Sequence, residues 1–199
     1  MDTILGNPSV VASLLSAVIA GSVALFVFAF TQFFSKKREQ IQFLTPKLEE
    51  LYLLLNSLSE NNVTIFKVAY NCANGDPHNC EQLQSIEEID LYGLRGAKQI
   101  IMYIRLYFPE LSRIHQHLFS AQNQLNNRIW SLNTSSPASK DEIVNYCGQV
   151  GHFLRLMESE IIENRDKLVG DYIFPKRYIK TTDKQIKAMP SPPDEPVMA

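Results

Sequence analysis

The fold of this chain is decided near its N-terminus by the stretch VVASLLSAVIAGSVALFVFAFTQFF, residues 10–34. This run carries no Asp, Glu, Lys or Arg, although the chain of 199 residues is 20% charged and has a formal net charge of -2. A bilayer core about 30 Å thick is crossed by about 20 apolar helical residues. The stretch therefore predicts a transmembrane helix over residues 10–34, preceded by a short extracytoplasmic N-terminus, residues 1–9.

The few polar side chains of the stretch are compatible with a spanning helix. They are Ser13, Ser16, Ser22, Thr31 and Gln32. Small hydroxyls can donate to carbonyls of their own helix, and the last two residues fall near the aqueous boundary. A cleaved signal peptide fits less well, because residues 1–8 carry no Lys or Arg, the apolar run is too long and its end is rich in bulky phenylalanine. We expect the helix to remain as an anchor.

The charges that flank the stretch predict its orientation. Lys36, Lys37 and Arg38 follow it directly, whereas Asp2 is the only charged side chain before it. Cytoplasmic flanks carry an excess of Lys and Arg, so we expect a single-pass protein with its N-terminus outside and its body in the cytoplasm. The three membrane-flanking cations can also interact with anionic lipid, which makes membrane lipid an expected partner.

Small residues recur within the predicted span. Ser13, Ala17 and Gly21 are spaced four apart, which places them on one helix face where a second helix backbone can approach closely. The spacing makes these residues candidates for helix packing between copies of the chain. Small residues are common in spanning helices, so chance is the alternative explanation.

The body, residues 36–170, shows apolar residues at a spacing of three to four and no strand-like alternation. A first helix is expected from the membrane to about Cys72, with Pro46 either kinking it or starting a separate helix. The turn signal Asn74-Gly75-Asp76-Pro77 follows.

The second apolar series keeps one phase across Pro109, which favours one long, Pro-kinked helix, or two nearly collinear ones, from Ser85 to Leu132. Ser139 and Glu142 form a capping-box pattern at the start of a third helix that ends near Gly170. Three amphipathic helices joined by short loops pack most simply as an antiparallel, coiled-coil-like bundle. The same pattern permits pairing between chains.

After the predicted bundle the composition changes. Residues 171–199 begin with a short aromatic and basic segment and end in a proline-rich stretch. The aromatic segment could fold back on the bundle, contact a partner or meet lipid headgroups. We expect this tail to be largely disordered, because proline-rich segments of this kind do not form a packed core.

No motif for catalysis or cofactor binding occurs. The chain lacks GxxxxGK[ST], GxGxxG, HExxH, GxSxG and CxxC patterns. Cys72, His78 and Cys80 form the best metal-like group, but their spacing matches no common zinc site. Two reduced cysteines beside a turn are the preferred interpretation; a Cys72–Cys80 disulfide, which suits an oxidising compartment, and a metal site are the alternatives.

Two further sequence features bear on location and partners. The glycosylation sequons that start at Asn62 and Asn133 matter only if the body is lumenal. A sequence pI near 6.1 is not that of a typical nucleic-acid binder.

Taken together, these patterns predict an all-α, non-enzymatic membrane protein without cofactor, metal, nucleic acid or evident small-molecule substrate. Its expected role is to scaffold or recruit a protein partner at the cytoplasmic membrane face. The alternative is an oligomerising effector that perturbs or permeabilises the bilayer under control of the bundle.

Overall fold

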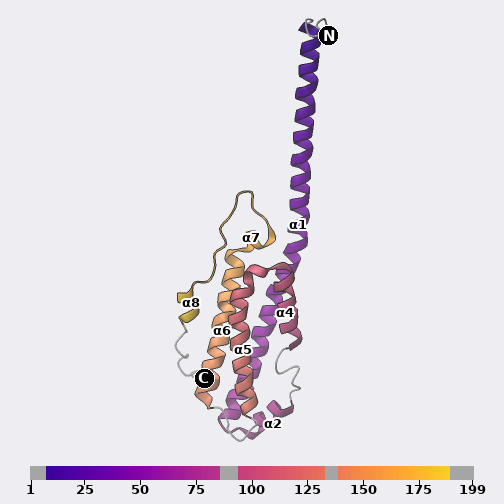
Figure 1. Cartoon of the computed structure of the whole chain (residues 1–199). Helices are drawn as coiled ribbons and strands as arrows, with labels where there is room; N and C mark the ends of the chain where they lie inside the picture. Colours follow the sequence, from indigo (N-terminus) through magenta and orange to yellow (C-terminus); the bar gives the residue numbers. More distant parts are fainter. Residues whose placement is uncertain (1–7, 86–93, 133–138, 189–199) are drawn as a thin grey trace, which may run out of the picture. The chain divides into compact units, whose positions relative to one another are not determined.

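The computed structural model of the chain describes residues 8–85, 94–132 and 139–188, and helices are the only regular elements in these ranges. The elements are α1 (Pro8–Ala73), α2 (Pro77–Ser85), α4 (Leu94–Tyr107), the 3-10 turn η1 (Pro109–Leu111), α5 (Ser112–Ser131), α6 (Lys140–Glu163), α7 (Arg165–Val169) and α8 (Asp183–Lys187) (Figure 1). The chain divides into two compact units, Met1–Phe43 and Leu44–Ala199. The expected all-helical class is confirmed for the described residues.

The first unit contains the apolar part of α1. By length and composition α1 is able to cross a membrane, and none of its most apolar window is buried. The hydroxyls of Ser13, Ser22 and Thr31 donate to the carbonyls of Ser9, Val18 and Val27, at 3.0, 2.8 and 2.7 Å. These polar side chains are therefore satisfied within their own helix, as the sequence predicts.

Pro46 does not start a new helix, because α1 is continuous through it to Ala73. Proline removes one backbone donor and leaves the carbonyl four residues earlier without a partner. Pro46 and Gln42 are both exposed, so water can satisfy that carbonyl. The alternative of a separate helix after Thr45 is therefore wrong.

The turn after α1 brings two cysteines together. Gly75 adopts φ +88°, a left-handed conformation that suits glycine, and α2 starts at Pro77. Asp76 caps this start, since its carboxylate accepts from the His78 backbone N–H at 3.0 Å and the Asn79 amide at 2.6 Å. The Asn79 bond is the main reason why the pKa of Asp76 is lowered.

Cys72 and Cys80 form a disulfide across this turn, with their Cα atoms 4.8 Å apart. The preferred interpretation of two reduced cysteines is thereby corrected. The physical reason is the tight reversal at Gly75, which places both Cα atoms within the range that a disulfide requires. In this disulfide form neither sulfur is available as a thiolate ligand, so Cys72, His78 and Cys80 do not form a metal site.

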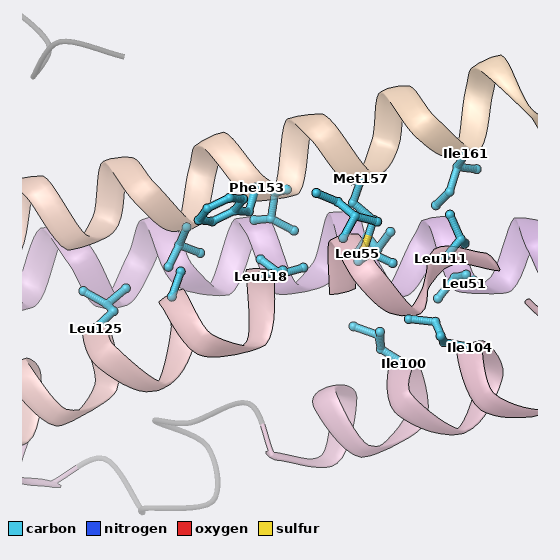
Figure 2. Close-up of a cluster of buried hydrophobic side chains, with 14 of the residues drawn as sticks. Leu51, Leu55, Ile100, Ile104, Leu111, Leu118, Leu125, Phe153, Met157 and Ile161 are labelled. Atoms are coloured by element: carbon cyan, nitrogen blue, oxygen red, sulfur yellow. The ribbon is translucent and has the colours of Figure 1, made fainter. Parts of the chain in front are cut away.

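The expected single second helix is divided in two. α4 ends at Tyr107, and the chain reverses through Phe108 and η1 into α5. In Figure 2, Ile100 and Ile104 of α4 advance toward the end where Leu51 and Ile161 lie, whereas Leu118 and Leu125 of α5 run away from it.

The expectation of one kinked or collinear helix is therefore wrong. The reason lies at Phe108, whose backbone leaves the helical region at φ -133°, ψ 57°, while Pro109 supplies no donor to continue α4. The residues just before α4, including the expected Ser85 to Glu88 start of the helix, fall partly outside the described ranges.

The core of the second unit is built from facing apolar stripes of α1, α4, α5 and α6. Figure 2 shows it as successive groups along the helices; the labelled residues are Leu51, Leu55, Ile100, Ile104, Leu111, Leu118, Leu125, Phe153, Met157 and Ile161. All ten are buried. Full burial of one such side chain contributes about 1.5–3 kcal/mol, so these stripes are the main source of stability of the second unit.

A polar cluster interrupts the apolar core between α1 and α5. Asn62 and Gln122 exchange amide hydrogen bonds of 2.9 and 3.0 Å, and Gln122 also donates to Asn126 at 3.0 Å. All three residues are buried. Because every amide in a core must find a partner, this cluster fixes the register of α1 against α5.

The third predicted helix begins as expected. Ser139 caps α6 in a reciprocal capping box with Glu142. α6 ends at Glu163, the short α7 follows, and Gly170 closes α7 at φ +80°.

The C-terminal segment is not largely disordered over residues 176–188. This segment, which we name the C-terminal strap, lies against α5 and α6 and includes α8. Thr181 is buried and Tyr178 packs against the core. The expected disorder is corrected here because composition does not reveal the buried acceptor, Glu160, that holds the strap; residues 189–199 lie outside the described ranges.

Candidate functional site

An apolar groove on the second unit is the best candidate site. It has a volume of about 510 Å³ and is lined by α1, α6 and the start of α7. The lining residues, which define the groove throughout, are Leu48, Glu49, Tyr52, Leu53, Ile161, Ile162 and Arg165. Leu48 and Ile161 are buried and form its floor.

The groove exists because two apolar side chains lie outside the core stripes. Leu53 follows Leu51 by two residues, a rotation of about 200° around a helix, so it points away from the core that Leu51 enters. Leu53 is 65% exposed and Ile162 is 63% exposed. Two large aliphatic side chains are therefore exposed to water at one groove, which makes the groove a candidate binding surface.

Charged side chains of opposite sign border the groove. Glu49 comes from α1 and Arg165 from α7, where the guanidinium also lies 3.9 Å from the Asp166 carboxylate. An apolar floor with one acid and one base at its edge can select the register of an amphipathic helix. Sequence reasoning missed this site, because Leu53 and Ile162 are two among several exposed apolar residues of the second unit.

The site residues predicted from sequence lie in the first unit. Ser13, Ala17 and Gly21 are on the uncovered surface of α1, and a Cβ added to Gly21 would meet no atom within 4 Å. Lys36, Lys37 and Arg38 continue the same helix. The described chain places no partner segment on this small-residue face, so its packing role remains a prediction.

A second cavity, of about 300 Å³, lies between α4 and α5. Its lining is Ile101, Ile104, Arg105, Ser112, His115, Gln116 and Phe119. Burial, and secondarily the charge of Arg105, lowers the pKa of His115, which stacks on Phe119. No carboxylate or thiol lines the cavity with this imidazole, and Ser112 supplies the one hydroxyl group of the lining.

Metal binding and thiol chemistry are the remaining possibilities for a reactive centre in the described ranges. In the described ranges, no group of three or more His, Cys, Asp or Glu side chains is arranged to hold a metal ion. Burial raises the pKa of the free Cys147 thiol to about 11, so little thiolate forms near neutral pH. The groove remains the candidate functional site of the described residues.

No family model matches the chain, and neither the curated proteins nor the solved structures with which it was compared include a match.

Proposed function

We propose that this chain is a single-pass, membrane-anchored, non-catalytic helical protein that recruits a protein partner to the cytoplasmic face of the membrane. Residues 10–34 are its anchor and the second unit is its binding module. The single observation that carries the proposal is the groove. Its exposed Leu53 and Ile162 border the buried, apolar Leu48 and Ile161.

Within this proposal the body acts as an antiparallel helical bundle, in which α4 and α5 take the place of the expected second helix. The alternating directions of α1, α4, α5 and α6 in Figures 1 and 2 support this arrangement. A bundle of this kind holds the groove-lining residues on rigid helices, so the groove is formed before a partner arrives. Preorganisation of this type reduces the ordering cost of binding.

Two observations bear on the proposed orientation in opposite directions. The Cys72–Cys80 disulfide is of a type that persists in oxidising compartments, which argues for an external body. Asn62, however, carries a sequon and is buried in the amide cluster with Gln122, so a glycan on it is incompatible with this core. The buried sequon and the cationic flank of Lys36, Lys37 and Arg38 both favour a body in the cytoplasm. In that compartment we expect the Cys72–Cys80 pair to respond to the redox state.

Protease added to intact cells is expected to leave the second unit uncut, because the proposed orientation places it behind the membrane. The measurement is an immunoblot for the C-terminal part of the full chain, before and after treatment. Permeabilised cells serve as the control and should show cleavage. Cutting in intact cells would reverse the orientation and assign the disulfide a permanent, structural role.

Partner binding at the groove predicts a position-specific crosslink. A photoreactive amino acid at Ile162 of the full chain in native membranes is expected to form a discrete protein adduct. The change Leu53→Glu should reduce that adduct at least tenfold, because a carboxylate in an apolar groove must be desolvated. Leu53 is exposed, so the fold is expected to tolerate this change.

The matched control is Val63→Glu, which adds the same charge to a 49% exposed position of α1 outside the groove. This control should leave the adduct unchanged. Equal loss in both variants, or no adduct at all, counts against the groove as a binding site.

The second candidate, an oligomerising membrane effector, draws on the uncovered small-residue face of α1. Space around Gly21 admits a larger side chain without a clash inside the chain. A change such as Gly21→Ile adds bulk to the face at which a second copy of the helix would approach. Dye entry into expressing cells that Gly21→Ile abolishes would favour the effector over the recruiting module.

A further inference from the structure

The loop between α7 and the C-terminal strap presents apolar side chains to solvent. We name Tyr172, Ile173 and Phe174 the apolar tip. Ile173 is 77% exposed and Phe174 is 80% exposed, the highest values among the large apolar side chains of the described residues. Isolated exposed apolar residues are ordinary, but consecutive ones at a loop end are characteristic of a surface that meets an apolar phase.

The base of this loop is held in place by hydrogen bonds. The Asp171 N–H donates to the Asp166 carbonyl at 2.7 Å, directly after the left-handed Gly170. Beyond the tip, Lys176 Nζ donates to the Asp166 carboxylate at 2.6 Å, and Lys167 Nζ donates to the Lys176 carbonyl at 2.6 Å. Figure 1 shows the resulting loop extending from α7 and returning toward α8. The exposure of the tip is therefore a feature of a pinned loop.

Cations surround the tip in excess. Residues 165–177 contain four Lys or Arg and two Asp. Lys176 is paired with Asp166, while Arg177 follows it as an exposed residue. Basic side chains beside exposed aromatic and aliphatic ones are the combination that binds the surface of an anionic bilayer.

The apolar tip lies at the end of the second unit that contains the unit's first residues. The groove joins α1 residues Leu48–Leu53 to Ile161, Ile162 and Arg165, so the end of α6 lies beside the start of the unit. α7 and the tip follow within a few residues. At this same end the chain is connected, through residues 35–43, to the apolar stretch 10–34.

We propose that the apolar tip inserts into the interfacial region of an anionic lipid bilayer, as a second membrane contact besides the spanning helix. Ile173 and Phe174 enter the acyl boundary, Tyr172 lies at headgroup level, and Arg177 binds lipid phosphate. The contact would orient the groove relative to the membrane surface. This inference rests on the proposed membrane anchoring by residues 10–34.

The test uses the full chain reconstituted in vesicles of phosphatidylcholine and phosphatidylglycerol. Trp130 is the only tryptophan and lies near the end of α5, so Trp130→Phe combined with Phe174→Trp leaves a single indole at the tip. Lipids brominated near the headgroup end of their acyl chains quench an indole that they touch. For the indole at position 174 we expect a roughly twofold loss of emission, and less in vesicles of phosphatidylcholine alone.

The unchanged protein is the matched control, because its Trp130 lies far from the tip. Leu111, at the start of α5, lies beside Leu51 and Ile161 in Figure 2, whereas Trp130 is at the other end of α5. Its emission should hardly change with brominated lipid. Adding Ile173→Asp to the tip variant should remove most of the quenching, and Arg177→Glu should remove the dependence on phosphatidylglycerol.

Alkaline extraction of the same vesicles distinguishes failure of the tip contact from failure of the membrane anchoring by residues 10–34. A chain that resists extraction but shows no quenching at position 174 overturns the tip contact alone. A chain that alkaline buffer extracts overturns the anchoring on which the inference rests. Quenching that Ile173→Asp leaves unaltered also overturns the tip contact.

Discussion

Replacing Phe108 with alanine is expected to lower the free energy of unfolding of the second unit by about 3–5 kcal/mol. Phe108 is fully buried and stands where the chain reverses between α4 and α5. Its backbone N–H donates to Ile104 at 3.1 Å and its carbonyl accepts from Leu111 at 3.0 Å. The side chain thus fills the space that the reversal creates, and alanine leaves a cavity there.

Denaturant unfolding of the full chain in detergent, followed by far-ultraviolet circular dichroism, measures this loss. Phe119→Ala removes the same ring from a 41% exposed position of α5 and should cost less than about 1 kcal/mol. Phe108→Leu should lower the free energy of unfolding by an intermediate amount, because leucine fills part of the cavity that alanine leaves. Equal effects of Phe108→Ala and Phe119→Ala would contradict the buried position of Phe108.

Replacing Glu160 with alanine is expected to release the C-terminal strap and to cost about 2–4 kcal/mol. Glu160 is 5% exposed and accepts from the Tyr178 hydroxyl at 3.0 Å and the Thr181 N–H at 2.9 Å, as well as from the Thr181 hydroxyl. Removing the carboxylate leaves these buried donors without an acceptor. The strap can satisfy them only by moving into water.

Neighbouring contacts decide how far the strap is released. Asn164 bonds both the N–H and the carbonyl of Ile179, at 2.7 Å each, and Arg113 bonds Asp183 and the Thr181 carbonyl. The Arg113–Asp183 ion pair is exposed and holds the strap less well than the buried carboxylate does, whereas Asn164 is only 3% exposed and continues to hold Ile179. Burial and the nearby Glu160 charge raise the pKa of Tyr178, so its phenol stays a donor at neutral pH.

Hydrogen exchange of the full chain measures strap release. The amide of Thr181 should exchange much faster in Glu160→Ala than in the unchanged protein, and Glu160→Gln should show an intermediate rate because it keeps one acceptor oxygen. Glu163→Ala, one turn further along α6 on its exposed side, is the matched control. Unchanged protection of Thr181 in Glu160→Ala would show that the carboxylate does not hold the strap.

Helices were predictable wherever the apolar spacing was long and uninterrupted. Residues 10–34 contain no charged side chain, and the stripe through Leu48, Leu51 and Leu55 repeats at helical spacing, so both segments of α1 follow from pattern alone. The turn at Gly75 and the capping box at Ser139 follow equally, because each depends on residues adjacent in sequence.

The reversal at Phe108 was not predictable from periodicity. Two helices that pack on the same core keep compatible apolar phases whether they are collinear or folded back, because the spacing records which face is buried and not the direction of the chain. Pro109 marks a break in either case. The direction is decided by the core that Ile104, Phe108 and Leu111 share with α1 and α6.

The candidate groove was also not predictable from the sequence. Leu53 and Ile162 are far apart in the chain, and each alone is an ordinary exposed apolar residue. Only the packing of α1 against α6 turns them into the walls of one groove.

The sequence by itself determined the helical class, the apolar stretch at residues 10–34 and the cationic flank that follows it, because these depend on composition and local spacing. The tertiary structure alone decided the reversal at Phe108, the groove and the strap on Glu160, and it selected the Cys72–Cys80 disulfide among the alternatives that the sequence left open. Each of these joins side chains whose proximity depends on how the chain folds back on itself. Local propensity and hydrophobic period carry no information about such pairs, whereas close packing in the core selects them.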